Sequence, residues 1–335
     1  MKNIIFLCPA EKSPFGGAKI IYQYSSLIKT FKNYDSCVIH LKKKKSSKFF
    51  KSIKKRLNLE KIDSNGLHSN EIRVVKNFRY KWFNNRIKIK NDLKFNYKKD
   101  FVIIPEIYSQ LSDIFILKKI PYAVFVQNGY SLFSTNNSKL LKNSYKNAKY
   151  LISYSKDIDN CIKLLFPQFS KKIVRVKCSI NEKKINIKAK KNNWITYMPR
   201  KLPVHSNLVI NFLKNKLSKK WIFKSLNNLD ESQVFNQLSK SKIFLSFSDL
   251  EGLGLPPIEA AIAGNKVIGY TGEAGKEFWK KPIFSTIPSG NIKKFCKTVM
   301  VEINNKSFLI KTQKARKKIT NAFSMGNEKK SIINF

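Results

Sequence analysis

Cysteine and histidine are scarce in this chain. Its 335 residues include five cysteines and three histidines, and the cysteines are scattered, odd in number and without a C-x-x-C pair. This usage excludes a disulfide framework and a zinc site built on C-x-x-C, and it is typical of a reducing compartment. The few histidines leave little material for histidine-based proton transfer.

Acidic residues and arginine are also few. The chain has 21 Asp and Glu against 66 Lys and Arg, which gives a formal net charge of +45. Such a balance suits nucleic acid, an anionic membrane surface or an acidic substrate. Arginine, the side chain that reads bases by paired hydrogen bonds, makes up few of the basic residues. Lysine accompanies abundant Asn and Ile, a pattern typical of AT-rich coding. We therefore interpret the charge first as compositional, keep an anionic membrane surface as an alternative partner, and disfavour nucleic acid.

Long apolar runs are missing as well. No segment approaches the roughly 20 apolar residues that a membrane-spanning helix needs. The apolar start at residues 4–8 is shorter than the apolar region of a signal peptide, and Glu11 and Lys12 follow at once. We expect a soluble, cytoplasmic protein, or one that is peripheral at the inner membrane face.

The chain does contain a regular alternation of short apolar runs and amphipathic segments. Residues 3–8, 101–105 and 122–126 have the pattern of buried strands, whereas residues 20–31 have apolar side chains at helical spacing. This alternation predicts an α/β fold with parallel sheets. The length suffices for two domains. A lysine-rich connector after Cys178 divides them into residues 1–178 and 179–317.

The most informative stretch follows the strand-like run Ile243 to Phe247. Gly252 and Gly254 permit positive φ and close approach of a ligand, and Pro256-Pro257 suits a helix start. No Ser, Thr, Asp or Asn precedes the prolines to cap the helix. The amides of Gly252, Leu253, Gly254 and Leu255, with the helix dipole, are therefore expected to bind an anion.

Two glutamates flank this anion site, Glu251 in the loop and Glu259 in the first helical turn. A carboxylate beside a phosphate is useful when it binds something else, and sugar hydroxyls are the natural target. The alternative is that Glu259 only satisfies the helix dipole and that Glu251 is a solvated loop residue.

The stretch has a family resemblance. Residues 251–260, EGLGLPPIEA, followed by residues 264–268, GNKVI, resemble the E-x7-E signature of retaining, nucleotide-sugar-dependent GT-B glycosyltransferases. More narrowly they resemble family 4 (glycosyltransferases group 1), which commonly shows EGFGLPxLEAMAxGxPVI. Leu253 stands in place of the usual Phe and Lys266 in place of the usual Pro.

The resemblance implies a GT-B architecture, with two Rossmann-like domains facing across a cleft and a last helix, at about 318–335, packing back on the first domain. It implies that Arg200 and, less directly, the adjacent Lys201 bind the donor diphosphate, where preorganised cations stabilise the charge of the leaving group. Glu259 would then hold ribose hydroxyls and Glu251 the sugar hydroxyls near the reacting carbon. Because the protein's own cations fill this role, no metal is expected.

Four residues of the first half are candidates for the cleft and the acceptor side. Gly16-Gly17 opens a helix after the first strand, but it is not a full dinucleotide fingerprint, so NAD is disfavoured. In the resembled family a Gly-Gly pair here lines the cleft; a plain turn is the alternative. Gln127 and Asn128 end a strand, where ligands of open α/β sheets bind. They stand near the position of a histidine in many relatives, and an amide cannot act as a base.

Three further segments have two interpretations each. The lysine-heavy region 42–61 and the aromatic-basic stretch 78–83 would dock on lipid headgroups or cradle a lipid-linked acceptor, or else form a solvated face over a small satellite core. Asp157 and Asp159 form a D-x-D, a metal signature of the GT-A fold, but they follow the N-cap residue Ser155 and fit a first helical turn.

The resemblance therefore implies transfer of a sugar from a nucleotide diphosphate sugar to a glycan or lipid-linked acceptor, with retention and without metal or other cofactor, in cell-surface polysaccharide synthesis. Two alternatives stay open. A GT-B nucleotide-sugar epimerase would need more acid and histidine groups than the chain offers. A non-enzymatic, basic nucleic-acid-binding protein would show steep salt dependence and indifference to Glu259→Ala.

Overall fold

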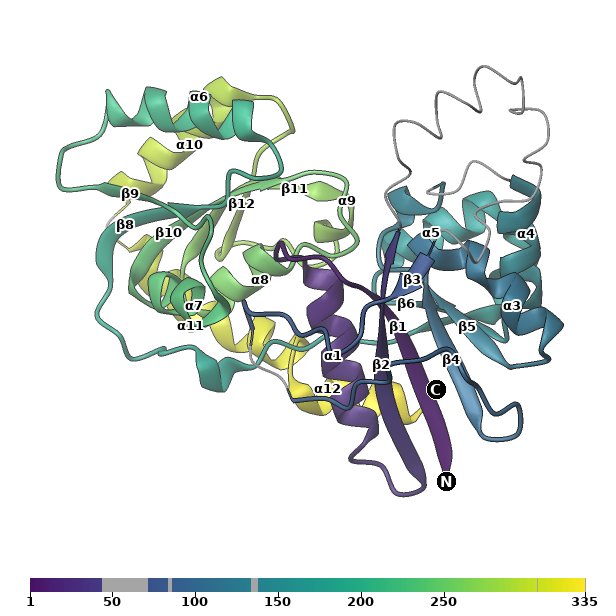
Figure 1. Ribbon diagram of the computed structural model, residues 1–335. Helices are drawn as coiled ribbons and strands as arrows, with labels where there is room; N and C mark the ends of the chain where they lie inside the picture. Colours follow the sequence, from purple (N-terminus) through teal and green to yellow (C-terminus); the bar gives the residue numbers. More distant parts are fainter. Residues whose placement is uncertain (44–71, 84–85, 134–137, 306, 335) are drawn as a thin grey trace, which may run out of the picture. The chain divides into compact units, whose positions relative to one another are not determined.

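The computed structural model describes residues 1–43, 72–83, 86–133, 138–305 and 307–334, and most of the lysine-heavy region 42–61 lies outside them. The chain forms two compact units, Met1–Ser153 with Ile158–Arg175 and Tyr154–Asp157 with Val176–Phe335. Each unit is built around one sheet (Figure 1). The predicted α/β fold with two parallel-sheet domains is confirmed. The limits 1–178 and 179–317 and the packing of the last helix on the first domain stay predictions.

The first unit has a seven-stranded sheet in the order β3-β2-β1-β4-β5-β6-β7. All its strand pairs are parallel except β2 with β3. Its strands and helices are, in chain order, β1 (Lys2–Pro9), α1 (Gly16–Ile28), β2 (Tyr34–Lys43), β3 (Ile72–Val74), β4 (Asp100–Pro105), the 3-10 helix η3 (Glu106–Leu111), α3 (Ser112–Leu117), β5 (Tyr122–Phe125), the 3-10 helix η4 (Gly129–Ser131), α4 (Ser138–Asn147), β6 (Tyr150–Ser153), α5 (Lys156–Leu165), the 3-10 helix η5 (Pro167–Lys172) and β7 (Ile173–Arg175).

The strand order of the first unit reverses direction beside β1. From β1 the chain adds β2 and β3 on one side and β4 to β7 on the other. In open parallel sheets, ligands bind outside the carboxyl ends of the strands at this switch point. The segments that follow β1, β4 and β5 are therefore where a ligand is expected, and they include the Gly16-Gly17 pair and Gln127.

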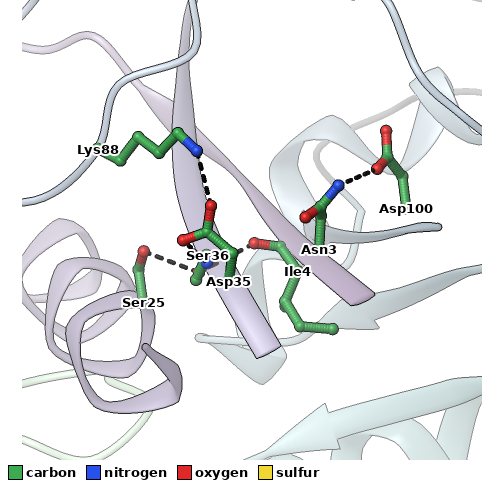
Figure 2. Close-up of polar contacts among 7 residues, drawn as sticks. All are labelled: Asn3, Ile4, Ser25, Asp35, Ser36, Lys88 and Asp100. Atoms are coloured by element: carbon green, nitrogen blue, oxygen red, sulfur yellow. Dashed lines mark hydrogen bonds and ion pairs between the residues drawn. The ribbon is translucent and has the colours of Figure 1, made fainter. Parts of the chain in front are cut away.

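The opposite, amino-terminal edge of this sheet is held by polar contacts (Figure 2). Asn3 Nδ2 donates to Asp100 Oδ1 at 2.8 Å, which ties the start of β1 to the start of β4. Ser36 Oγ donates to the Ile4 carbonyl at 2.9 Å and lies 2.9 Å from Ser25 Oγ on α1. These contacts give the amino-terminal edge a structural role, since they tie β1 to β4, β2 and α1.

The aromatic-basic stretch 78–83 packs inward. Tyr80 and Phe83 are buried, and their rings stack with centroids 5.4 Å apart. Both contact Tyr22 of α1, whose hydroxyl lies 2.8 Å from His40 Nε2 on β2. The structure therefore favours the satellite-core interpretation of this stretch, because its aromatic side chains pack against α1 and the sheet.

The second unit has a five-stranded, all-parallel sheet in the order β12-β11-β10-β8-β9. A connector that contains the 3-10 helix η6 (Glu182–Lys184) precedes its first strand. Its other elements are, in chain order, β8 (Asn192–Tyr197), α6 (Pro203–Lys214), β9 (Ile222–Ser225), α7 (Glu231–Lys240), β10 (Ser241–Ser248), α8 (Leu255–Ile262), β11 (Lys266–Thr271), α9 (Gly272–Gly275), β12 (Phe284–Thr286), α10 (Ile292–Asn304), α11 (Phe308–Ala322) and α12 (Met325–Ile333).

Helices cover both faces of this second sheet. Strand side chains alternate between the faces, so Ile243, Leu245 and Phe247 of β10 point to one side. There they pack with Val209 of α6 and Phe295 of α10. Helices α7, α8 and α11 cover the other face (Figure 1). The near-continuous apolar sequence of β10 is the pattern of a strand buried on both faces.

The last helix, α12, is fastened to the segment that follows β7. The buried carboxylate of Glu328 accepts hydrogen bonds from the backbone N–H and the hydroxyl of Ser179, at 3.0 and 2.9 Å. The backbone N–H of Ile180 donates to the Phe323 carbonyl just before α12. These contacts place α12 and residues 176–180 in the same compact unit.

Candidate functional site

The strand order of the second unit reverses between β8 and β10. These neighbouring strands pair in parallel, with Tyr197 opposite Leu245. The segment after β8 contains Arg200 and Lys201, and the segment after β10 contains Glu251 and the glycine loop. Two stretches that are far apart in the sequence therefore leave the same edge of the sheet side by side, at the position where such sheets bind ligands.

The loop after β10 turns sharply into α8. Gly254 has φ 81° and ψ 68°, the left-handed conformation, and it is the N-cap residue of the helix. An L-residue with a side chain would pay roughly 1–2 kcal/mol for this backbone. No side chain caps α8, and the prolines at its start have no N–H to donate. The amino end of α8 keeps the positive end of its dipole toward the loop.

Glu251 lies over this turn. Its side chain is 18% exposed, and a Cβ built on Gly254 would lie 3.7 Å from Glu251 Oε2 and 3.8 Å from Ser248 Oγ. Burial raises the pKa of the Glu251 carboxyl, while the charges of Lys201 and Arg200 act to lower it. The carboxylate therefore lies against the glycine turn and is largely shielded from solvent. This position suits hydrogen bonding to a bound hydroxyl.

The cation of Lys201 lies next to this carboxylate. Its Nζ lies 3.9 Å from Glu251 Oε1, and its side chain is 44% exposed. Arg200 contributes to the same electrostatic environment. Both residues precede α6, which starts at Pro203, because proline is well suited to the first turn of a helix.

Glu259 is buried in α8, at 7% exposure. Its expected place in the first helical turn is wrong: α8 begins at Leu255, so Glu259 is the fifth helical residue and the first turn contains no acid. The left-handed backbone of Gly254 sets this start, because such a residue cannot belong to a right-handed helix. A role for Glu259 limited to satisfying the dipole of the first turn loses its support, since the dipole effect falls off within that turn.

In the first unit the structure brings Gly17 and Gln127 into contact. Gln127 Nε2 donates to the Gly17 carbonyl at 2.9 Å, although the two residues are 110 positions apart. A Cβ on Gly17 would lie 2.5 Å from Gln127 Oε1, so glycine is what allows this approach. Gly16 is the exposed first residue of α1. Asn128 serves as the cap of the short helix η4, since its Oδ1 accepts from the Tyr130 N–H at 3.0 Å.

Glu106 organises the same edge and was not singled out from the sequence. It directly follows β4 and is 3% exposed. Its two carboxylate oxygens accept the backbone N–H groups of Gln127 and Asn128, at 3.0 and 3.1 Å. Burial raises the pKa of Glu106 to about 7, and the backbone hydrogen bonds oppose that rise. An acid placed immediately after an apolar strand was the signal that could have identified it.

The D-x-D segment has a structural explanation. Asp159 lies in α5, where its carboxylate forms an ion pair with Arg175 of β7 and accepts a hydrogen bond from Ser153 Oγ. These contacts tie α5 to the edge of the sheet. Among the residues that the structure describes, no three His, Cys, Asp or Glu side chains gather as a metal-binding group.

Comparison by sequence gives no match, either to a protein-family model or to a curated protein. Comparison of structures does. The chain is similar to S. aureus TarM, crystallised as a point mutant with fondaparinux, α-GlcNAc-glycerol and UDP, with a TM-score of 0.70, 12% identity, and coverage of 100% of this chain and 99% of that chain.

Two further solved structures are similar over nearly the whole chain. Anabaena Alr3699/HepE in complex with UDP and glucose has a TM-score of 0.69 and 10% identity, covering 100% of this chain and 99% of that chain. A glycosyltransferase from Rickettsia africae ESF-5 has a TM-score of 0.63 and 14% identity, covering 99% of this chain and 97% of that chain. The chain therefore has the fold of the GT-B glycosyltransferases. Among the described residues, no helix is long and apolar enough to cross a membrane.

Proposed function

We propose that this protein is a glycosyltransferase that uses a nucleotide diphosphate sugar as donor. The observation that carries the proposal is the convergence, at the switch point of the second sheet, of Arg200 and Lys201 with Glu251 and the glycine turn that opens α8. Cations, an uncapped helix amino end and a carboxylate in one place suit a ligand with a diphosphate and hydroxyl groups.

Each group has a proposed role in the transfer. Arg200, Lys201 and the amides from Gly252 to Leu255 stabilise the negative charge that builds on the leaving diphosphate. Glu251 holds hydroxyls of the donor sugar, and Glu259 holds those of the nucleotide ribose. The protein's own cations supply the electrostatic stabilisation that a metal ion gives in other enzymes, so we propose that no metal or other cofactor is used.

The acceptor is proposed to be a glycan or a lipid-linked glycan. TarM and HepE were crystallised with sugars beside UDP, and those complexes support the class of substrate. In this chain we propose that the acceptor binds at the carboxyl edge of the first sheet, where Gly17, Gln127 and Asn128 lie. Transfer with retention, in cell-surface polysaccharide synthesis at the inner membrane face, completes the proposal and rests on the resemblance of residues 251–268.

The test is the thermal stability of wild type and Glu259→Ala with UDP, GDP, dTDP, CDP and ADP, each with and without EDTA. A ligand at a hundredfold its Kd adds about 2.7 kcal/mol to the stability of the folded state. We expect one nucleotide to stabilise the wild type, to do so equally with EDTA, and to act much less on the variant. Equal, salt-sensitive stabilisation by every nucleotide would contradict the proposal and favour non-specific charge.

A further inference from the structure

Helix α6 presents an exposed apolar row that is not part of the core. Val204, Leu208 and Phe212 are 67%, 43% and 57% exposed. They follow one another at intervals of four residues, so they lie on one face of the helix. Val209, Ile210 and Leu213 form the opposite, buried face. Among the described residues, no other helix carries three exposed large hydrophobic side chains.

The chain segment that contains this row is basic and lacks acids. Residues 202–224, which run from the start of α6 into β9, contain no Asp or Glu. They do contain five lysines: Lys214, Lys216, Lys219, Lys220 and Lys224. Ile222, at the exposed start of the edge strand β9, adds a further apolar side chain at 50% exposure.

Helix α10 packs beside α6 (Figure 1). Lys293, Lys297 and Val301 are exposed and again spaced by four residues. The single acid of α10, Glu302, does not bring free negative charge, since its carboxylate pairs with Lys266 Nζ at 2.9 Å and accepts from Ser285 Oγ at 2.7 Å. The α6–α10 surface, meaning the exposed residues of α6, of α10 and of 215–222, therefore combines an apolar row with exposed lysines.

We propose that the α6–α10 surface docks on an anionic lipid bilayer. An amphipathic helix with an apolar row and flanking lysines lies in the plane of such a surface, with its apolar side chains among the acyl chains and its ammonium groups among the headgroups. Each lysine near an anionic leaflet adds to the electrostatic attraction between protein and membrane. The apolar row favours lipid over nucleic acid as the partner. A phosphate backbone attracts the lysines electrostatically but offers no apolar contact to Leu208 or Phe212.

This inference locates the proposed glycosyl transfer at a membrane surface. It does not depend on the chemistry of that transfer. It also replaces the aromatic-basic stretch 78–83 as the docking surface, since Tyr80 and Phe83 are buried. A membrane-bound enzyme would meet a lipid-linked acceptor at the surface where that acceptor resides.

The test is flotation of the full chain with phosphatidylcholine vesicles, with and without phosphatidylglycerol. We expect binding only when the anionic lipid is present. The variant L208E/F212E should bind at least tenfold more weakly, because the apolar contribution of two side chains to vesicle binding is lost. Ile310→Glu is the matched control, because Ile310 of α11 is 57% exposed like Phe212; it should bind as the wild type does.

A second variant, K216Q/K219Q/K220Q, keeps the test decisive if L208E/F212E is unstable. It should weaken vesicle binding more than tenfold, at about fivefold for each lysine removed near the surface. Absence of binding to anionic vesicles overturns the proposal, and so does wild-type binding by both variants. Tight binding of a short RNA that depends on the lysines but not on Leu208 and Phe212 overturns it too, as does a dimer in solution that only L208E/F212E dissociates. Nucleotide binding is measured in parallel and should be unchanged in all these variants.

Discussion

Gln127 Nε2 donates a hydrogen bond to the Gly17 carbonyl at 2.9 Å and so joins the end of β5 to the start of α1. Gly17→Ala should break this contact, because the new Cβ would lie 2.5 Å from Gln127 Oε1. The expected loss in the free energy of unfolding is about 1 kcal/mol.

A double-mutant cycle measured in urea isolates this contact. In a Gln127→Ala background the clash is gone, and alanine is favoured over glycine in a helix by up to about 1 kcal/mol. Gly17→Ala should therefore be neutral or stabilising there. An equal cost in both backgrounds would show that Gly17 is needed for another reason.

Glu106 should make the first unit less stable as pH rises. Its folded-state pKa is about 7 against an ordinary value of 4.5, so between those values the folded state keeps a proton that the unfolded state has lost. The contribution of protonated Glu106 to the free energy of unfolding is fully present below pH 4.5. It is lost as the pH rises through 7, by up to about 3 kcal/mol. Glu106→Gln should flatten this slope in urea unfolding followed across that range. The exposed Glu182→Gln should leave the slope unchanged, and an unchanged slope in Glu106→Gln would sink the assignment.

Lys201 should matter for binding and little for folding. A half-exposed ion pair at 3.9 Å contributes no more than about 1 kcal/mol, whereas a charge-assisted hydrogen bond to a phosphate contributes about 1.5–3 kcal/mol. Lys201→Met should therefore weaken binding of the nucleoside diphosphate at least tenfold in calorimetric titration, with a similar unfolding midpoint. Loss of a cation should also raise the pKa of Glu251 further. Lys188→Met, on the exposed connector, is the control and should bind normally.

Lys191 should contribute strongly to the stability of the second unit. Its Nζ donates to the carbonyls of Leu238 and Ala263, at 3.2 and 2.6 Å, and to Asn265 Oδ1 at 3.0 Å. Lys191→Met leaves three acceptors without their donor and should cost about 3 kcal/mol in urea unfolding. Exposed Lys190→Met should cost almost nothing. Equal stability of the two variants would show that the three contacts are replaced by water.

Burial also lowers the pKa of Lys191 to about 7, so the folded state releases this proton earlier than the unfolded state does. Between about pH 7 and the ordinary lysine value of 10.5, the unfolded state binds more protons, and the stability contributed by this group rises with pH. In Lys191→Met this rise should disappear. The slope is opposite in sign to that of Glu106 and occupies a higher pH range.

The sequence predicted well what depends on neighbours along the chain. The apolar run of β10, the glycine turn at Gly254 and the prolines of α8 each act locally, and together they placed the loop at the edge of a parallel sheet. Arg200 was placed beside this loop by resemblance, and the strand order explains why the two segments meet.

What the sequence did not reveal depends on contacts between distant segments. Glu106 and Lys191 gain their roles from backbone groups 21 to 72 residues away, which no local pattern encodes. The burial of Tyr80 requires Tyr22 as its partner. The apolar row of α6 was missed for a different reason: apolar residues at helical spacing predict a core, and only the structure separates Phe212 from Leu213.

The central claim is that the chain consumes a nucleotide sugar, and proton NMR of the anomeric signals tests it most directly. Wild type and Glu251→Gln are each incubated with UDP-glucose and other nucleotide sugars, with and without EDTA, with water as the default acceptor. We predict that one donor disappears as its nucleoside diphosphate is released, that the new anomeric centre keeps the donor's configuration, and that EDTA has no effect. Glu251→Gln should be at least a hundredfold slower, as for loss of a transition-state hydrogen bond of about 2.7 kcal/mol. A new nucleotide sugar formed without release of the nucleotide would contradict the account in favour of an epimerase. Donors that all remain intact, with water and with an added glycan acceptor, would contradict catalysis altogether.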